Sequence, residues 1–179
     1  MKSIATRVAG FTFGMLVVTF IFHPERFGSF WWQTYSDPSG SFSLKFPSKP
    51  GVSDLQAQLD GGGTAVVKMV AATPNKTTAY IFTYHDDSRF ASKTVEEVLN
   101  LARDGGIAGV HGALLDERRI QVDGHQGRDI EARSAAGLLL NTRLIADGQR
   151  MVILTVETAG QKVDSKNVQR FFDSLKLSN

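Results

Sequence analysis

Apolar and polar residues alternate along much of the chain with the two-residue period of a strand that is buried on one face. The alternation is clearest where Phe42, Leu44 and Phe46 are separated by Ser43 and Lys45. Clusters of Pro, Gly, Asp and Asn interrupt such stretches and indicate turns. In the first half of the chain this pattern predicts strands at residues 33–36, 42–46, 52–59, 64–72 and 78–84.

The period changes to that of a helix in two places. After residue 94 apolar residues recur every three or four positions, and Thr94 with Glu97 has the form of a capping box. Gly105 and Gly106 give this helix its expected end, with a weaker helical pattern continuing toward Val110. A second helix is expected at residues 163–175, with Asp164 or Ser165 as its N-cap and an apolar stripe of Val168, Phe171, Phe172 and Leu175.

Four further strands are expected between the two helices. Consecutive strands that are joined by tight turns run antiparallel. The last of the four is apolar on both faces, so we expect it at the centre of a sheet. The predicted fold class is therefore α+β, an antiparallel β-sheet flanked by helices, in a single domain at residues 32–179. The four strands are predicted at residues 114–122, 127–134, 138–146 and 150–157.

The N-terminal segment has the pattern of an export signal. Lys2 and Arg7 precede fifteen uncharged, mostly apolar residues, 8–22. This run is shorter than the about 20 residues of a usual membrane-spanning helix, but no pair of small residues typical of signal cleavage follows Phe22. We therefore expect residues 1–31 to form an uncleaved signal-anchor segment with a short linker. Two alternatives remain open, a cleaved signal of a secreted protein and a buried helix of a soluble one.

The orientation of such an anchor follows from its charges. Lys2 and Arg7 would keep the N-terminus in the cytoplasm. The domain would then be held at the inner membrane through residues 8–22 and would face the periplasm or the exterior. The aromatic residues that follow suit either the membrane–water interface or the start of a folded core. These residues are Phe27, Phe30, Trp31 and Trp32.

Composition narrows the classes of partner and cofactor. The absence of cysteine excludes disulfides, zinc–thiolate sites, iron–sulfur clusters and a lipoprotein anchor. Removing Lys2 and Arg7 from the 20 Lys and Arg leaves 18, which equals the 18 Asp and Glu. Since no basic cluster with interleaved aromatic residues is present either, we expect no nucleic-acid partner. No cofactor is expected.

Four segments, in their order along the chain, resemble small exported bacterial domains of uncharacterised function that have the PsbP/Mog1-like fold. Named members of that fold include extrinsic photosystem subunits, a protein that binds a small GTPase, and exported lipoproteins. The resemblance implies binding more than catalysis, and it supplies no catalytic motif. This chain departs from the lipoprotein members because it lacks their cysteine. The segments are residues 37–47, 123–128, 143–151 and 171–175, which read DPSGSFSLKFP, DGHQGR, RLIADGQRM and FFDSL.

Candidate chemistry is sparse. His85, Asp86 and Asp87 form the densest group of possible metal ligands. Neighbouring residues of a strand point to opposite faces, so this group is expected to be the solvated start of a loop. The alternative is a small hydrolase or metal-binding protein in which His85 and Asp86 meet His111 or His125.

Alternating charges at residues 128–133 predict cross-strand ion pairs with Arg118 and Arg143. An anion-binding face built from Arg118, Arg128 and Arg143 is the alternative. With neither catalytic nor metal residues assigned, the sequence indicates a membrane-anchored extracytoplasmic binding or interaction module rather than an enzyme. A structural subunit of an envelope complex is a further alternative, and another envelope protein is the expected partner.

Overall fold

The structure, a computed structural model, describes residues 7–8, 18–19, 31–58, 64–160 and 164–178. Two short strands, β1 (Arg7–Val8) and β2 (Val18–Thr19), pair antiparallel with each other. The remaining elements are β3 (Gln33–Ser36), β4 (Phe42–Phe46), β5 (Gly51–Gln58), β6 (Thr64–Ala72), β7 (Thr78–Asp86), the 3-10 helix η1 (Ser88–Ser92), α1 (Val95–Gly109), β8 (Ala113–Val122), β9 (His125–Arg133), β10 (Leu139–Asp147), β11 (Arg150–Thr158), α2 (Ser165–Asp173) and β12 (Lys176–Leu177).

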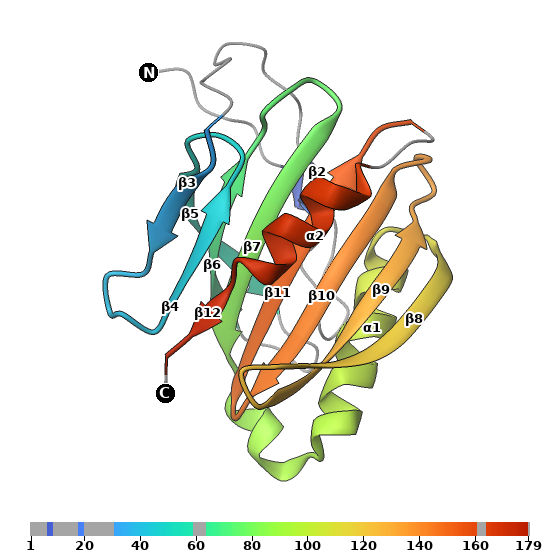
Figure 1. Cartoon of the computed structure of the whole chain (residues 1–179). Helices are drawn as coiled ribbons and strands as arrows, with labels where there is room; N and C mark the ends of the chain where they lie inside the picture. The colour runs from blue at the N-terminus through green and yellow to red at the C-terminus, as the bar shows by residue number, and fades with distance from the viewer. Residues whose placement is uncertain (1–6, 9–17, 20–30, 59–63, 161–163, 179) are drawn as a thin grey trace.

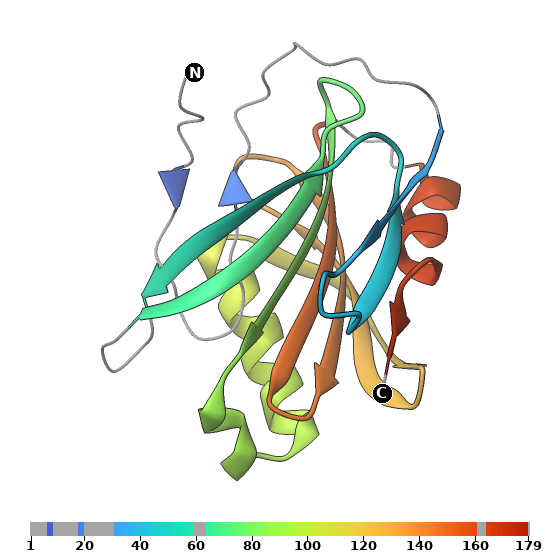
Figure 2. The ribbon, with the colours of Figure 1, turned by 90° about the vertical axis from the view of Figure 1, so that its left-hand side faces the viewer.

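A seven-stranded antiparallel sheet forms the middle of the domain, in the order β5-β6-β7-β11-β10-β9-β8. Helix α1 covers one face of this sheet, and helix α2 covers the other (Figures 1 and 2). A small sheet of order β12-β4-β3 lies beside α2 on that second face. The expected α+β class, an antiparallel sheet flanked by helices, is therefore confirmed.

Strand β11 lies in the centre of the large sheet, as its two apolar faces predict. It pairs with β7 on one side and with β10 on the other. Every residue of β11 after Arg150 is buried. A strand with both faces covered needs apolar side chains on both, which is why its sequence shows no polar alternation.

The sequence placed most elements within one or two residues, and α1 shows the clearest difference. Its capping box is present, because Thr94 N–H donates to Glu97 Oε2 at 2.7 Å and Glu97 N–H donates to Thr94 Oγ1 at 3.3 Å. Gly105 and Gly106, the expected end, are buried inside the helix, which continues to Gly109. Burial of this turn outweighs the modest helix-breaking tendency of glycine. η1 and β12 were not predicted.

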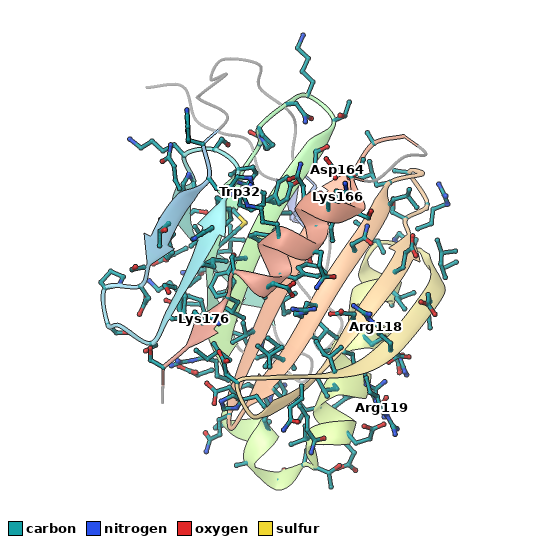
Figure 3. The ribbon with its side chains drawn as sticks, in the orientation of Figure 1. Trp32, Arg118, Arg119, Asp164, Lys166 and Lys176 are labelled. Atoms are coloured by element: carbon teal, nitrogen blue, oxygen red, sulfur yellow. The ribbon has the colours of Figure 1, made fainter. Side chains whose placement is uncertain are left out.

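Trp31 and Trp32 differ in their surroundings. The Trp32 ring packs edge-on against Tyr80, with centroids 6.0 Å apart, and lies 4.5 Å beneath the Arg170 guanidinium. Figure 3 shows Trp32 close to the first turn of α2, on the side of β3. Trp31 is 79% exposed. Trp32 therefore begins the folded core, while Trp31 points outward; Phe27 and Phe30 lie outside the described residues.

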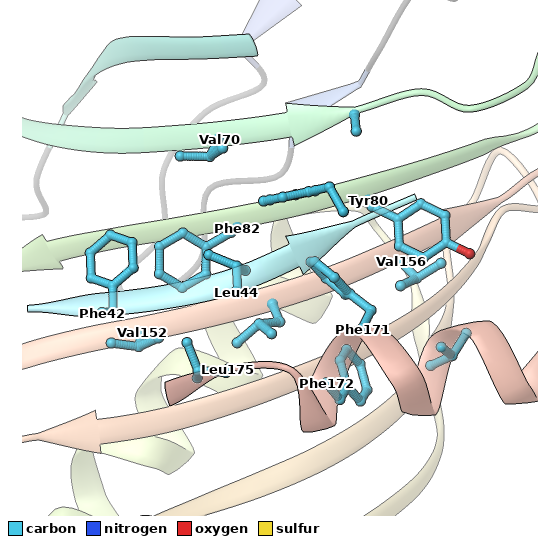
Figure 4. Packing of buried hydrophobic residues seen from close by; sticks show 14 of the residues in the cluster. Phe42, Leu44, Val70, Tyr80, Phe82, Val152, Val156, Phe171, Phe172 and Leu175 are labelled. Carbon is cyan, nitrogen blue, oxygen red and sulfur yellow. The ribbon is translucent and has the colours of Figure 1, made fainter. Parts of the chain in front are cut away.

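The largest core cluster lies between the sheet and the layer formed by α2 and β4 (Figure 4). The Phe171 side chain is fully buried, and its ring centroid lies 5.2 Å from that of Phe46 and 5.3 Å from that of Tyr80. Phe172 is also buried, against the Arg143 guanidinium at 4.9 Å. The predicted apolar stripe of α2 is confirmed, and Asp164 is its N-cap.

The predicted anchor is not tested by the described residues. Apart from the short strands β1 and β2, residues 1–30 lie outside them, and so does most of the segment 8–22 in which the apolar helix is expected. Within the described ranges no helix is both long enough and apolar enough to cross a membrane.

Candidate functional site

The group His85, Asp86 and Asp87 does not converge on one point. His85 is buried beside Phe90, with ring centroids 6.0 Å apart, and burial lowers the pKa of its imidazole. Asp86 is exposed and accepts a hydrogen bond from Arg150 Nε at 2.8 Å. Asp87 caps η1 and accepts from Arg89, whose hydrogen bonds lower the pKa of the Asp87 carboxyl. Each side chain therefore has a structural role at the start of the loop.

The other histidines do not complete a site. His111 follows α1, at the opposite end of the sheet from His85. His125 lies at the start of β9, three strands from His85 and thus about 14 Å away. Its Nδ1 lies 3.4 Å from Asp147 Oδ1. The described residues hold no group of three His, Asp or Glu side chains that could bind a metal. The hydrolase or metal-site alternative for these residues is therefore wrong.

The three arginines of the suggested anion-binding face lie on opposite faces of the sheet. Arg143 and Arg118 both donate to Asp129, with Arg143 Nε at 2.7 Å and Arg118 Nη2 at 2.7 Å. Burial opposes the charge on Asp129, but the hydrogen bonds from Arg143 and Arg118 outweigh it and lower its pKa. The expected cross-strand ion pairs are confirmed.

Arg128 belongs to a second network on the α1 side. Its guanidinium donates to Glu96 of α1 at 2.6 Å and to Glu117 of β8. Arg103 of α1 also donates to Glu117, at 2.9 Å. Burial opposes the charge on Glu117, yet these hydrogen bonds outweigh it and lower its pKa. The alternative of a shared anion-binding face is wrong. Arg128 points to the face opposite that of Asp129, which binds Arg118 and Arg143. On each face the arginines are already paired with carboxylates.

A buried carboxyl that the sequence did not single out is Glu157. It is 4% exposed and lies on β11, next to Ala79 of β7 and Leu140 of β10. It makes no hydrogen bond or ion pair with another described residue, and burial raises its pKa to about 8. The sequence does hold a signal for it, because Glu157 is the one carboxylate in a predicted strand that is apolar on both faces.

Two adjacent exposed leucines, Leu114 and Leu115, lie at one edge of the large sheet. Among the described strands β8 pairs only with β9, so none of them covers its outer edge. The register shifts between Leu114 and Asp116, which makes Leu115 the extra residue of a β-bulge. Leu114 is 42% and Leu115 is 50% exposed. An open edge with exposed apolar side chains can accept a further strand.

Comparison with known proteins supports the fold and no family assignment. No protein-family profile and no curated protein matches the chain. The solution structure of cyanobacterial PsbP (CyanoP) from Synechocystis sp. PCC 6803 superposes with a TM-score of 0.59 and 12% identity, over 88% of this chain and 99% of that one. The Saccharomyces cerevisiae Ran-binding protein Mog1p superposes with a TM-score of 0.47 and 10% identity, over 83% of this chain and 96% of that one. The likeness to cyanobacterial PsbP confirms the expected PsbP/Mog1-like fold.

Proposed function

We propose that this protein is a membrane-anchored interaction module whose domain lies on the extracytoplasmic side of the inner membrane. The basic residues Lys2 and Arg7, followed by fifteen uncharged residues, support the anchor and its orientation. The folded core begins at Trp32, ten residues after Phe22. Residues 8–22 hold the module at the membrane, and the sheet-and-helix domain meets a protein partner.

The open edge of β8 is the observation that carries the interaction role. Backbone N–H and C=O groups on the outer side of an edge strand are available to an added strand, which gives affinity through main-chain hydrogen bonds. Leu114 and Leu115 add apolar area at the bulge. The partner is an extended segment of another envelope protein. Its apolar side chains cover the two leucines, and its backbone extends the seven-stranded sheet.

The other edge strand, β5, suits this role less well. Its exposed apolar residue, Val52, is followed by Asp54, which forms an ion pair with Lys68 of β6 at 2.6 Å. Leu55 of β5 turns inward and packs on the small cluster formed by β6 and β7. β5 therefore exposes Val52 alone and packs Leu55 inward, whereas β8 exposes two adjacent leucines.

Site-specific photo-crosslinking in intact cells tests the interaction. A photoreactive amino acid at Leu115 should give one dominant crosslinked species of constant mass. The matched control is the same probe at Val66, which is 54% exposed but lies on β6. Leu114→Ser should weaken the Leu115 crosslink while leaving the amount of protein unchanged. Equal crosslinking from both probes, or from neither, would contradict a partner at β8 and leave the bulge as protection against aggregation.

A further inference from the structure

Five cations gather at the end of the sheet from which the N-terminal segment departs. We call this the proximal end: it holds Trp31, the loops at residues 47–50, 73–77, 133–138 and 159–160, and the start of α2. The loops belong together because Phe46 pairs with Gln33, and because Ala159 N–H donates to the Thr77 carbonyl at 2.8 Å. The cations are Lys49, Lys76, Arg133, Lys166 and Arg170, and all five are exposed.

No carboxylate of the described residues forms an ion pair with these cations. Asp164 is the sole acidic residue in the described parts of these segments. Asp164 is already used as the N-cap of α2, where it accepts from Asn167 N–H at 3.1 Å. In Figure 3, Trp32, Asp164 and Lys166 lie together at this end, and Lys176 lies toward the other.

The opposite end has the reverse character. Its turns carry Asp37, Asp86, Asp87, Asp123 and Asp147. Several of these carboxylates already have partners within the domain, such as Arg150 for Asp86. Five exposed, unpaired cations thus lie where the chain enters the domain, with Asp164 as the one described acidic residue among them, whereas five aspartates lie in the turns at the far end, together with Lys93 and Lys176. The charge distribution defines a direction along the strands.

We propose that the proximal end lies against an anionic lipid surface, with Trp31 in the headgroup layer. This inference rests on the proposed anchor. Eight residues separate Phe22 from Trp31, and an extended chain spans at most about 3.5 Å per residue, so the proximal end is held within about 30 Å of the membrane. This tether lets the basic side chains approach the headgroups. Anionic headgroups attract them once the distance falls to a Debye length, about 8 Å at physiological salt.

Trp31 supplies the apolar half of this contact. Tryptophan is enriched at the membrane–water interface because its ring is apolar and its N–H remains hydrogen-bonded. Trp31 is 79% exposed, whereas Trp32 is held by Tyr80 and Arg170. The acidic turns then point away from the membrane. The surface fixes the orientation of the domain, which leaves the β8 edge free to meet a partner alongside.

Tryptophan fluorescence of the full chain tests this surface directly. The chain has two tryptophans, so Trp32→Phe leaves Trp31 as the reporter. This variant is reconstituted into phosphatidylcholine vesicles, or into equal parts phosphatidylcholine and phosphatidylglycerol, with a shallow nitroxide-labelled lipid as quencher. We expect strong quenching of Trp31 in the anionic vesicles, and loss of most of it in phosphatidylcholine alone or in high salt.

Charge reversal supplies the matched control. Lys49→Glu, Lys76→Glu and Lys166→Glu together should abolish the anionic-lipid-dependent quenching. Lys45→Glu, Lys93→Glu and Lys176→Glu change the net charge equally at unpaired cations elsewhere, and should retain it. Equal quenching in both vesicle types, or equal loss in both triple variants, would overturn the surface.

Flotation of the same vesicles separates this inference from the proposed anchor. A chain that floats with both vesicle types but shows no lipid-dependent quenching overturns the surface alone. A chain that floats only with anionic vesicles, through the three lysines, supports the surface and overturns the anchor. A chain that floats with neither overturns both.

Discussion

Glu157 carries a carboxyl group in the interior of the domain, and no cation among the described residues pairs with it. Its neighbours across the sheet are the apolar residues Ala79 and Leu140. Burial penalises the charged form, which raises the pKa to about 8 in the folded protein. At neutral pH the folded domain therefore keeps Glu157 mostly protonated, while an unfolded chain ionises it near 4.5.

This difference predicts how stability depends on pH. Because the folded state binds a proton that the unfolded state releases, the free energy of unfolding falls as the pH rises from about 4.5 to about 8. The loss is complete above the folded pKa and is on the order of 5 kcal/mol at most. Glu157→Gln removes the titration and keeps the side-chain shape, so the variant should be the more stable protein at pH 9.

Thermal unfolding of the purified full chain at pH 5, 7 and 9 checks this prediction. The wild-type melting temperature should fall across the series, and that of Glu157→Gln should fall much less. Asp116→Asn is a suitable comparison, since Asp116 is exposed and forms no ion pair with a described residue. A wild-type protein that is most stable at pH 9 would contradict the burial of an unpartnered carboxyl.

Among the secondary-structure elements, helix α2 contributes directly to the core. Phe171 fills the space between Phe46 and Tyr80 and is fully buried. Truncating a buried phenylalanine removes its transfer free energy and leaves a cavity, which costs about 3–5 kcal/mol. Phe171→Ala should lower the free energy of unfolding by that amount. Lys166→Ala, an exposed change on the same helix, should stay within about 0.5 kcal/mol.

Urea denaturation of the two variants gives the comparison. A chain that lacks residues 165–179 extends the test, because it removes the whole helix together with β12. If α2 were a detachable helix that docks on a partner, the shortened chain would melt cooperatively at the unchanged temperature. Such a result would move the interaction site from β8 to α2.

The sequence pattern predicts the helices and strands well, because each helix or strand depends mainly on residues that are close together in the chain. The alternation at Phe42, Leu44 and Phe46 and the capping box of Thr94 with Glu97 are of this kind. Gly105 and Gly106 failed as a helix end because their burial depends on the sheet beneath α1. Trp31 and Trp32 are adjacent in sequence, and only the packing of Tyr80 and Arg170 separates their roles.

The candidate site depends more on strand order than on local pattern. One alternative from the sequence places Arg128 and Arg143 on one surface, but the alternation of β9 and β10 puts them on opposite faces. The separation of His85 from His125 follows from the insertion of β11 and β10 between β7 and β9. Strand order is a non-local property, so the burial of Glu157 and the open edge of β8 emerged only from the fold.

At the scale of the whole molecule, three features share one axis along the strands. Trp31 lies at the proximal end, five unpaired cations lie there with it, and the turns that carry five aspartates lie at the far end. In the arrangement that we propose, the module stands on the membrane with its strands rising from it. The β8 edge then runs up the side of the domain, where a neighbouring envelope protein can add a strand.

Protease accessibility in oriented membrane vesicles tests the central claim most directly. After alkaline carbonate washing, the full-length chain should remain in the membrane pellet of both right-side-out and inside-out vesicles. Protease added to right-side-out vesicles should remove the domain and leave a short protected fragment that contains residues 8–22. In inside-out vesicles the domain should stay intact until detergent is added. Release of the chain by carbonate, or digestion of the domain in inside-out vesicles alone, would contradict a membrane-anchored extracytoplasmic module.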